Sequence, residues 1–497
     1  MTPDKKFRWA VKWAYVMNWG EQGLSALVLL VLASLLGPRD FGTVAMAMVY
    51  VLFIQMFQDQ GLVAALIQRK DLNNEHLNSV FWLTQAVSLV LVAVSVSLSG
   101  WWAAVNHLPE LQIIIIALSL TIPMEGLTVV QKAYLQRIMD FKSLSLRSNL
   151  SVLAGGGAGI AMALLGYGAW ALVGQQVVKS LAAVATLWAV SDWRPAFRFR
   201  AARVKELLSF SLANFFAKLA TFANRQADAL LMGLFFGPVT LGLYRLAQRM
   251  VDLFITVATR SIQTVSFPQF SKLQNSPEEL RRSMLACLRM SGYITLPALA
   301  GLAALSTPLL RVLGEKWVPA IPALQVLCAY GILFSFSQFF GPLLQALGRP
   351  LQLAILMWGA AGVGVLGIVG AAQGLQGASD ETQALVIALV RLGIGALLFV
   401  ILLVVLSRHC RISFRDLLVS NRAALVTAIL VCGAVLALPS MTGALKPWAE
   451  LALKGIVAGT VGLATLLGLD AELRLSVVST AARVVPGLAL LAERARR

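Results

Sequence analysis

The stretch LVLASLLGPRDFG at residues 30–42 returns 200 residues later as LLMGLFFGPVTLG at residues 230–242. In both copies an apolar run ends at a Gly-Pro pair, and a second glycine follows four residues after the proline. Proline ends a helix, and glycine accepts the strained backbone angles of a tight turn. Each copy is therefore predicted to form a short turn between two spans. Many turns between helices have this composition, but the identical spacing favours an internal repeat.

Long apolar segments surround both copies. Of the 497 residues, 58% are hydrophobic and 13% are charged, against about 25% charged in a soluble domain. Mean hydropathy is +0.78. Runs of about 20 apolar residues, enough to cross a bilayer as a helix, recur along the chain. They are continuous rather than alternating, which favours helices over a β-barrel.

The sequence thus predicts an all-α polytopic membrane protein with about fourteen transmembrane helices. The predicted spans are residues 14–36, 41–67, 78–102, 111–131, 147–167, 168–190, 208–236, 240–266, 284–308, 320–345, 350–372, 384–406, 422–439 and 448–468.

The basic residues indicate how the chain crosses the membrane. The formal net charge is +18, but the basic residues stand mainly between spans. This placement points to membrane topology and anionic lipid, and not to nucleic acid. With both termini in the cytoplasm, the cytoplasmic segments hold most of the basic residues, Lys132 and Arg147 among them. The outward loops then hold only Arg39, Arg311, Lys316 and Lys446.

Six predicted spans separate the two Gly-Pro turns, so both halves enter the membrane in the same direction. Such parallel repeats are related by an axis along the membrane normal. The predicted organisation is an N-lobe of spans 1–6 (1–190), a basic cytoplasmic linker (191–207), a C-lobe of spans 7–12 (208–406), spans 13–14 (407–468) and a basic cytoplasmic tail (469–497).

Charged residues interrupt the seventh and eighth predicted spans at helical spacing. They are Lys218, Arg225, Asp228, Arg245, Arg249, Asp252 and Arg260. One interpretation is a set of internal ion pairs, such as Arg225 with Asp228. Five basic residues against two acidic ones leave a surplus of positive charge. The surplus favours a water-filled cationic cavity for an anion, because the arginine fork suits phosphate oxygens.

The first half carries a weaker set of polar residues inside its spans. The candidates are Asn18, Glu21, Gln55, Asp59 and Glu125. Each can bind a proton or a sodium ion, contact sugar hydroxyls, or hydrogen-bond between helices. The sequence leaves these roles open and predicts no other cofactor and no metal site.

Other groups inside the spans are predicted to be structural. Lys179, Arg289, Arg391 and Lys454 are expected to extend toward the membrane surface. The glycines of 155–159 and of 359–370 are expected to mark close helix contacts, since no phosphate-loop Lys-Ser/Thr follows the first run. The four cysteines have no Cys-x-x-Cys pair, which argues against a disulfide framework or a zinc site.

Several motifs resemble those of a known transporter family. They are LLGPRDFGTVAMA (35–47), FQDQGLVAALIQRKDL (57–72), QKAYLQRIMDFKSLSLRS (131–148) and LLQALGRPLQLAIL (343–356). Together with the six-plus-six repeat, they resemble the polysaccharide-transporter branch of the multidrug/oligosaccharidyl-lipid/polysaccharide exporter superfamily. Within it they look like the Wzx-type flippases of the colanic-acid exporter group.

This resemblance implies an inner-membrane carrier of undecaprenyl-diphosphate-linked oligosaccharide that works by alternating access between two lobes. It also implies that a polysaccharide polymerase and export machinery act next in the same process. On this basis Arg225, Arg245 and Arg249 are expected to hold the diphosphate.

Three other functions stay open at this stage. A drug or cation antiporter and a peptidoglycan-precursor flippase of the same superfamily share the architecture, although a cationic cavity repels cationic drugs. A membrane glycan polymerase or ligase needs outward catalytic groups. The short outward loops offer few candidates with no evident constellation, so no enzyme activity is predicted.

Overall fold

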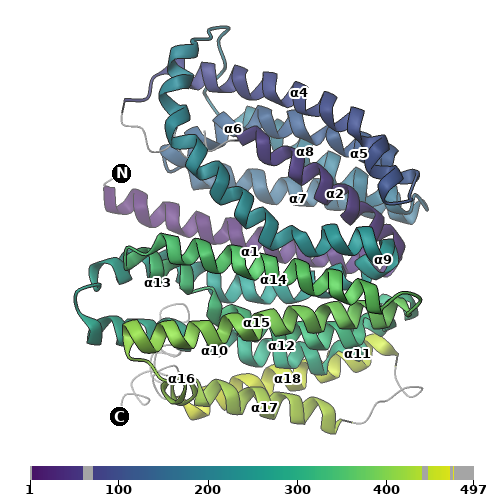
Figure 1. Ribbon diagram of the computed structural model, residues 1–497, viewed down its shortest axis with the longest axis vertical. Helices are drawn as coiled ribbons and strands as arrows, with labels where there is room; N and C mark the ends of the chain where they lie inside the picture. Colours follow the sequence, from purple (N-terminus) through teal and green to yellow (C-terminus); the bar gives the residue numbers. More distant parts are fainter. Residues whose placement is uncertain (1–2, 60–65, 67–70, 439–445, 471–473, 475–497) are drawn as a thin grey trace, which may run out of the picture. The chain divides into compact units, whose positions relative to one another are not determined.

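The computed structural model describes residues 3–59, 66, 71–438, 446–470 and 474, and within this part the regular structure is helical (Figure 1). The first helices are α1 (Pro3–Leu35), α2 (Pro38–Asp59), α4 (Asn74–Val105), α5 (Glu110–Ser119), α6 (Thr121–Arg137), α7 (Phe141–Leu164), α8 (Ala169–Val190) and α9 (Ala201–Lys272). They are followed by α10 (Pro277–Ala304), α11 (Ser306–Leu313), the 3-10 helix η1 (Glu315–Ala320), α12 (Ile321–Ser337), α13 (Phe340–Ala346), α14 (Pro350–Gly374), α15 (Asp380–Cys410), α16 (Phe414–Ser420), α17 (Arg422–Ala437) and α18 (Pro447–Leu469).

Every predicted span overlaps a helix, and the all-helical membrane fold is confirmed. Among the described residues, eleven helices are long and apolar enough to cross a membrane, or twelve if α16 and α17, bent by 64°, form one span. Two helices explain most of the difference from fourteen. α7 contains Lys142 and Arg147, which lower its hydropathy. α9 counts once, although Gly237 breaks it with a φ of +82°. The number fourteen stays a prediction.

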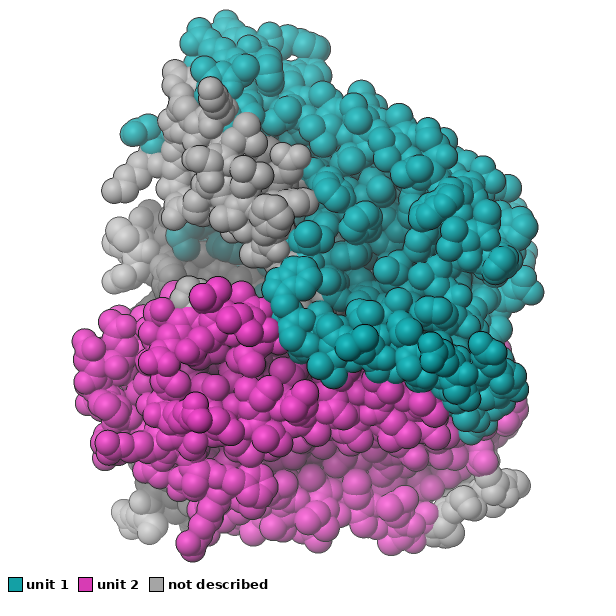
Figure 2. All heavy atoms as spheres, viewed as in Figure 1, with its two compact units in different colours: residues 1–246, 357–384 teal, residues 247–356, 385–497 magenta. Residues whose placement is uncertain are grey.

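The chain forms two compact units, shown in different colours in Figure 2. One unit comprises residues 1–246 and 357–384, and the other comprises 247–356 and 385–497. α9, α14 and α15 therefore contribute residues to both units. The predicted lobe boundaries follow the sequence repeat and stay a prediction.

In the first unit, glycines let α7 pack closely on its neighbours. A Cβ atom at Gly155 would lie 2.6 Å from the carbonyl oxygen of Gln175 on α8. One at Gly156 would lie 2.4 Å from Cγ2 of Val28 on α1. Close helix contacts are thus confirmed at these two glycines.

The glycines of α14 behave differently. Among the described residues, no heavy atom lies within 4 Å of a Cβ built at Gly359, Gly362 or Gly370. The prediction of close contacts is wrong at these positions, because α14 leaves an apolar face exposed, including Ile355 and Leu366.

The two Gly-Pro turns cross each other within the first unit. A Cβ atom at Gly42 would lie 1.6 Å from the carbonyl oxygen of Pro238. A Cβ atom at Gly242 would lie 1.9 Å from the carbonyl oxygen of Pro38. The glycine of each copy therefore packs on the proline carbonyl of the other copy, and no side chain separates the two backbones.

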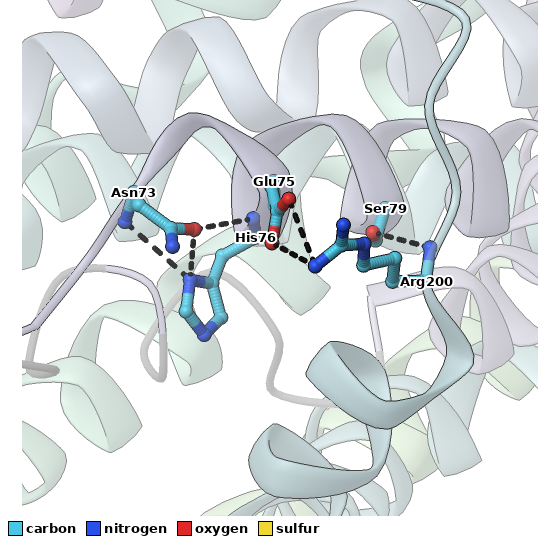
Figure 3. Close-up of polar contacts among 5 residues, drawn as sticks. All are labelled: Asn73, Glu75, His76, Ser79 and Arg200. Carbon is cyan, nitrogen blue, oxygen red and sulfur yellow. Dashed lines mark hydrogen bonds and ion pairs between the residues drawn. The ribbon is translucent and has the colours of Figure 1, made fainter.

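The predicted linker lies along the beginning of α4, as Figure 3 shows. Nη1 of Arg200 lies 3.1 Å from Oε1 of Glu75, and the Arg200 backbone N–H donates to Oγ of Ser79 at 3.0 Å. Asn73 caps α4 by accepting a hydrogen bond from the backbone N–H of His76 at 3.1 Å. This end of α4 thus fixes the chain between α8 and α9.

In the second unit, α18 contains a buried ion pair. Nζ of Lys454 lies 2.7 Å from Oε1 of Glu450, and the side chains are 10% and 8% exposed. The expectation that Lys454 extends toward the membrane surface is wrong, because a carboxylate one turn away neutralises it inside the unit. Arg391 is half-buried, with its guanidinium 5.3 Å from the ring centroid of Tyr330.

Candidate functional site

A charged cavity of about 240 Å³ lies inside the first unit. Its walls come from α1, α2, α6, α7 and α8. The α2 wall is partly apolar and includes Met48, Val51 and Leu52. The charged lining residues are Glu21, Glu125, Lys132, Arg147 and Lys179.

The carboxylates of the cavity belong to the polar set predicted from the sequence. Glu21 accepts a hydrogen bond from the hydroxyl of Ser148, which joins α1 to α7. Gln55 on α2 donates to Oγ1 of Thr121 at 3.1 Å, in the turn of α6 that precedes Glu125. The structure thus brings Glu21, Gln55 and Glu125 to one cavity.

Two other members of that set are placed differently. Asn18 is half-buried on α1, about one turn before Glu21, and is not among the residues that line the cavity. Asp59 ends α2, and its side chain lies outside the described residues.

The basic side of the cavity was not predicted. Lys132 follows the predicted span 111–131 and Arg147 begins the predicted span 147–167. Both were counted with the cytoplasmic segments, and the structure places them on α6 and α7, in the cavity wall. Lys179 lines the cavity on α8, and its expected extension toward the membrane surface stays a prediction. The spacing of Gln176, Lys179 and Ser180 on one face of α8 is the signal that could have found it.

The charges of the cavity do not cancel. Three basic residues face two carboxylates, which gives a formal charge of +1 when all five are ionised. Charged groups inside a membrane protein are kept where they pair or where water and ligands reach them. The cavity is therefore suited to a hydrated, polar ligand with negative charge.

The charged residues of α9 were the main candidates from sequence. Arg245 donates to Oε1 of Gln226 at 2.6 Å. Asp228 is 4% exposed and accepts a hydrogen bond from the hydroxyl of Tyr244 at 3.3 Å. These contacts lie within the first unit and bridge the kink at Gly237.

The remaining α9 candidates are further along the helix or undescribed. Arg249 and Arg260 are exposed, and Asp252 is half-buried, in the second unit. The side chains of Lys218 and Arg225 lie outside the described residues. The predicted cationic cavity on α9 therefore stays a prediction.

Comparison with known families decides what kind of protein this is. The family model described as polysaccharide biosynthesis protein matches residues 31–322, more than half of the chain. The chain belongs to this family. The resemblance predicted from the Gly-Pro and neighbouring motifs is thereby confirmed.

This polysaccharide biosynthesis protein has relatives in several bacteria. It is 30% identical over 350 residues to the succinoglycan biosynthesis transport protein ExoT of Rhizobium meliloti (strain 1021), which covers 70% of each chain. It is 28% identical over 345 residues to the lipopolysaccharide biosynthesis protein WzxC of Escherichia coli (strain K12), covering 68% of this chain and 69% of that one.

The fold of this polysaccharide biosynthesis protein is also that of a solved flippase. The lipid II flippase MurJ in an inward closed conformation matches with a TM-score of 0.71 over 92% of this chain and 98% of that chain. The two sequences are 13% identical, so the likeness shows the fold alone.

Proposed function

We propose that this protein is a flippase that moves undecaprenyl-diphosphate-linked oligosaccharide repeat units across the bacterial inner membrane, for export of exopolysaccharide or lipopolysaccharide. Its family, and relatives named for polysaccharide transport and lipopolysaccharide biosynthesis, support this assignment. The protein is a carrier and catalyses no covalent step. Both termini lie in the cytoplasm, and a polymerase and export machinery receive the flipped unit.

The charged cavity of the first unit is the observation that carries the proposal. Charged side chains within membrane-spanning helices are rare, and they face a partner or a water-filled cavity. Five charged residues from four helices nevertheless converge on one cavity. A protein that shields a hydrophilic headgroup from lipid needs such a wet, polar interior, while the lipid tail of the substrate remains in the bilayer.

The crossing of the two Gly-Pro turns supports alternating access. In that mechanism two repeats rock against each other around a central site. With the predicted topology, both turns lie on the outward side. Gly42 and Gly242 bring the two backbones into direct contact there, so the outward side closes at this crossing and opens when the turns separate.

The α9 cations complete the proposed transport path. In this mechanism Arg225, Arg245 and Arg249 hold the diphosphate, and Lys218 and Arg260 add positive charge nearby. The acidic candidates Glu21, Asp59, Glu125, Asp228 and Asp252, with Asn18, contact sugar hydroxyls or exchange a coupling proton or sodium ion.

Deletion of the gene tests the function. We expect surface polymer to disappear and lipid-linked repeat units to accumulate in the cytoplasmic leaflet, where a membrane-impermeant oxidant added to intact spheroplasts does not reach the sugars. Complementation with Arg249→Ala should fail at normal protein level. Arg39→Ala removes an exposed ion pair with Glu110 and should restore export.

Two results would contradict the flippase. Normal polymer in the deletion strain, together with drug resistance on overexpression, would favour a drug antiporter. Sugar transfer by the purified protein would make it a polymerase or ligase.

A further inference from the structure

The cavity of the first unit contains an arginine that lacks an internal partner. Nε of Arg147 is buried and has no hydrogen-bond acceptor among the described residues. None of the ion pairs found in the described part of the chain involves its guanidinium. A buried donor without an acceptor is uncommon and calls for a ligand or water.

The neighbouring helix brings a second cation to the same place. Gly155 lies two turns after Arg147 on α7, and a Cβ atom there would lie 2.7 Å from Cβ of Lys179. This close approach of α7 and α8 keeps Lys179 beside the face of α7 that carries Arg147. Lys132 on α6 lines the same cavity. Three cations from three helices therefore surround one space.

The size of the space limits what it holds. Sites for drug-sized ligands measure about 300–1,000 Å³. At about 240 Å³ this cavity is smaller, and suits a compact group rather than a chain of sugars. Ser180 and Gln176 add a hydroxyl and an amide to the wall formed by α8.

We infer that this cavity is a binding subsite for a phosphate-bearing anion, with Arg147, Lys179 and Lys132 as its cationic ligands. Arginine binds phosphate oxygens through its planar fork, and lysine through a point charge. Glu21 and Glu125 oppose the bound anion and keep the empty cavity from carrying a charge larger than +1. The inference rests on the proposed function for its physiological ligand, the diphosphate of the lipid carrier, and adds a site separate from the α9 cations.

Calorimetric titration of the purified full-length protein with inorganic pyrophosphate tests the subsite. Arg147→Gln should weaken binding at least tenfold, and Arg147→Lys should recover part of it. Glu21→Gln should tighten binding several-fold, because the amide still accepts the Ser148 hydrogen bond while a repelling charge is lost. Lys142→Gln removes an exposed cation of the same helix, outside the cavity, and should bind like the wild type.

The signs of these changes decide the result. Unchanged pyrophosphate affinity in Arg147→Gln, in a variant with wild-type thermal stability, would overturn the inference. So would weaker binding in Glu21→Gln. Loss of binding in Arg249→Gln alone would assign the anion to α9 instead. These binding results do not depend on the gene-deletion experiment. The flippase function and the anion subsite can therefore each be contradicted without the other.

Competition identifies the source of the phosphate. Undecaprenyl diphosphate in detergent should displace pyrophosphate from the wild type. It should displace no pyrophosphate from Arg147→Gln at the same concentration. Displacement by phosphatidylglycerol at equal concentration would mean that the cavity binds ordinary anionic lipid, and would overturn the link to the carrier.

Discussion

At the scale of single residues, the crossing at Gly42 has no room for a side chain. Because the nearest atom is a backbone carbonyl oxygen, it cannot rotate away as the end of a flexible side chain can. Gly42→Ala should therefore force the two turns apart, lower the melting temperature in detergent and stop polymer export.

Gly157→Ala is the matched control for this prediction. Gly157 lies within α7, and no described heavy atom is within 4 Å of a Cβ atom there. Alanine is a better helix former by up to about 1 kcal/mol, so this variant should be as stable as the wild type or more stable. If Gly42→Ala and Gly157→Ala had the same polymer export and the same melting temperature, the close contact at Gly42 would contribute nothing to stability or transport.

Residue by residue, the sequence predicted carboxylates better than cations. Glu21 and Glu125 stood out because a charge in the middle of an apolar run is conspicuous. Lys132 and Arg147 did not, because both lie at the edges of apolar runs, where positive charge normally marks a cytoplasmic loop. The packing of α6 and α7 beside α1, α2 and α8 turns these edge positions into a cavity wall.

At the scale of elements, the short helix α16 depends on its first turn. Ser413 and Asp416 form a capping box, and Nη2 of Arg281 lies 3.1 Å from Oδ1 of Asp416. The backbone N–H and hydroxyl of Ser413, and then Arg281, lower the pKa of Asp416. This turn precedes the predicted thirteenth span.

The lowered pKa of Asp416 predicts a pH dependence of stability. Its ionised form stabilises the folded state above the unfolded pKa, about 3.9, and this contribution is lost as pH falls through the lower folded value. Asp416→Asn should have a lower melting temperature than the wild type at pH 6 to 7. This difference in melting temperature should shrink below about pH 4. Melting curves in detergent across pH 3 to 7 measure it. A constant difference would contradict the prediction.

The helices themselves were largely predictable, because the length of an apolar run and the Gly-Pro pair that ends it are local properties of the sequence. The sequence predicted a turn at 237–242, and the structure has a break in the helical backbone at Gly237, where φ is +82° and ψ is −176°. The contacts of the glycines were not predictable. Whether a glycine meets another helix depends on packing that spacing alone does not encode, as Gly155 and Gly359 show.

At the scale of the whole molecule, the bend in α9 decides the topology. If α9 crosses the membrane twice, every later loop lies on the side that the fourteen-span prediction gives. If it crosses once, every later loop changes side. Gln376 is exposed between α14 and α15, and Arg198 is exposed in the linker before α9.

Cysteine labelling distinguishes the two topologies. In intact cells, a membrane-impermeant maleimide should label Gln376→Cys and leave Arg198→Cys unlabelled, and inverted vesicles should reverse this pattern. Three of the native cysteines, Cys287, Cys328 and Cys410, are buried and should give little background. Labelling of both positions from the same side would mean that α9 is one span.

The crossed Gly-Pro turns also bear on the origin of the chain. Each copy offers its glycine to the proline of the other, so the same patch serves on both partners, which is the defining property of an isologous dimer interface. A half-length ancestor with one such turn could have paired with itself in parallel orientation. Gene duplication and fusion would then have joined the two copies in one chain. A substitution at Gly42 or Pro238 would then require a compensating substitution in the other half of the chain.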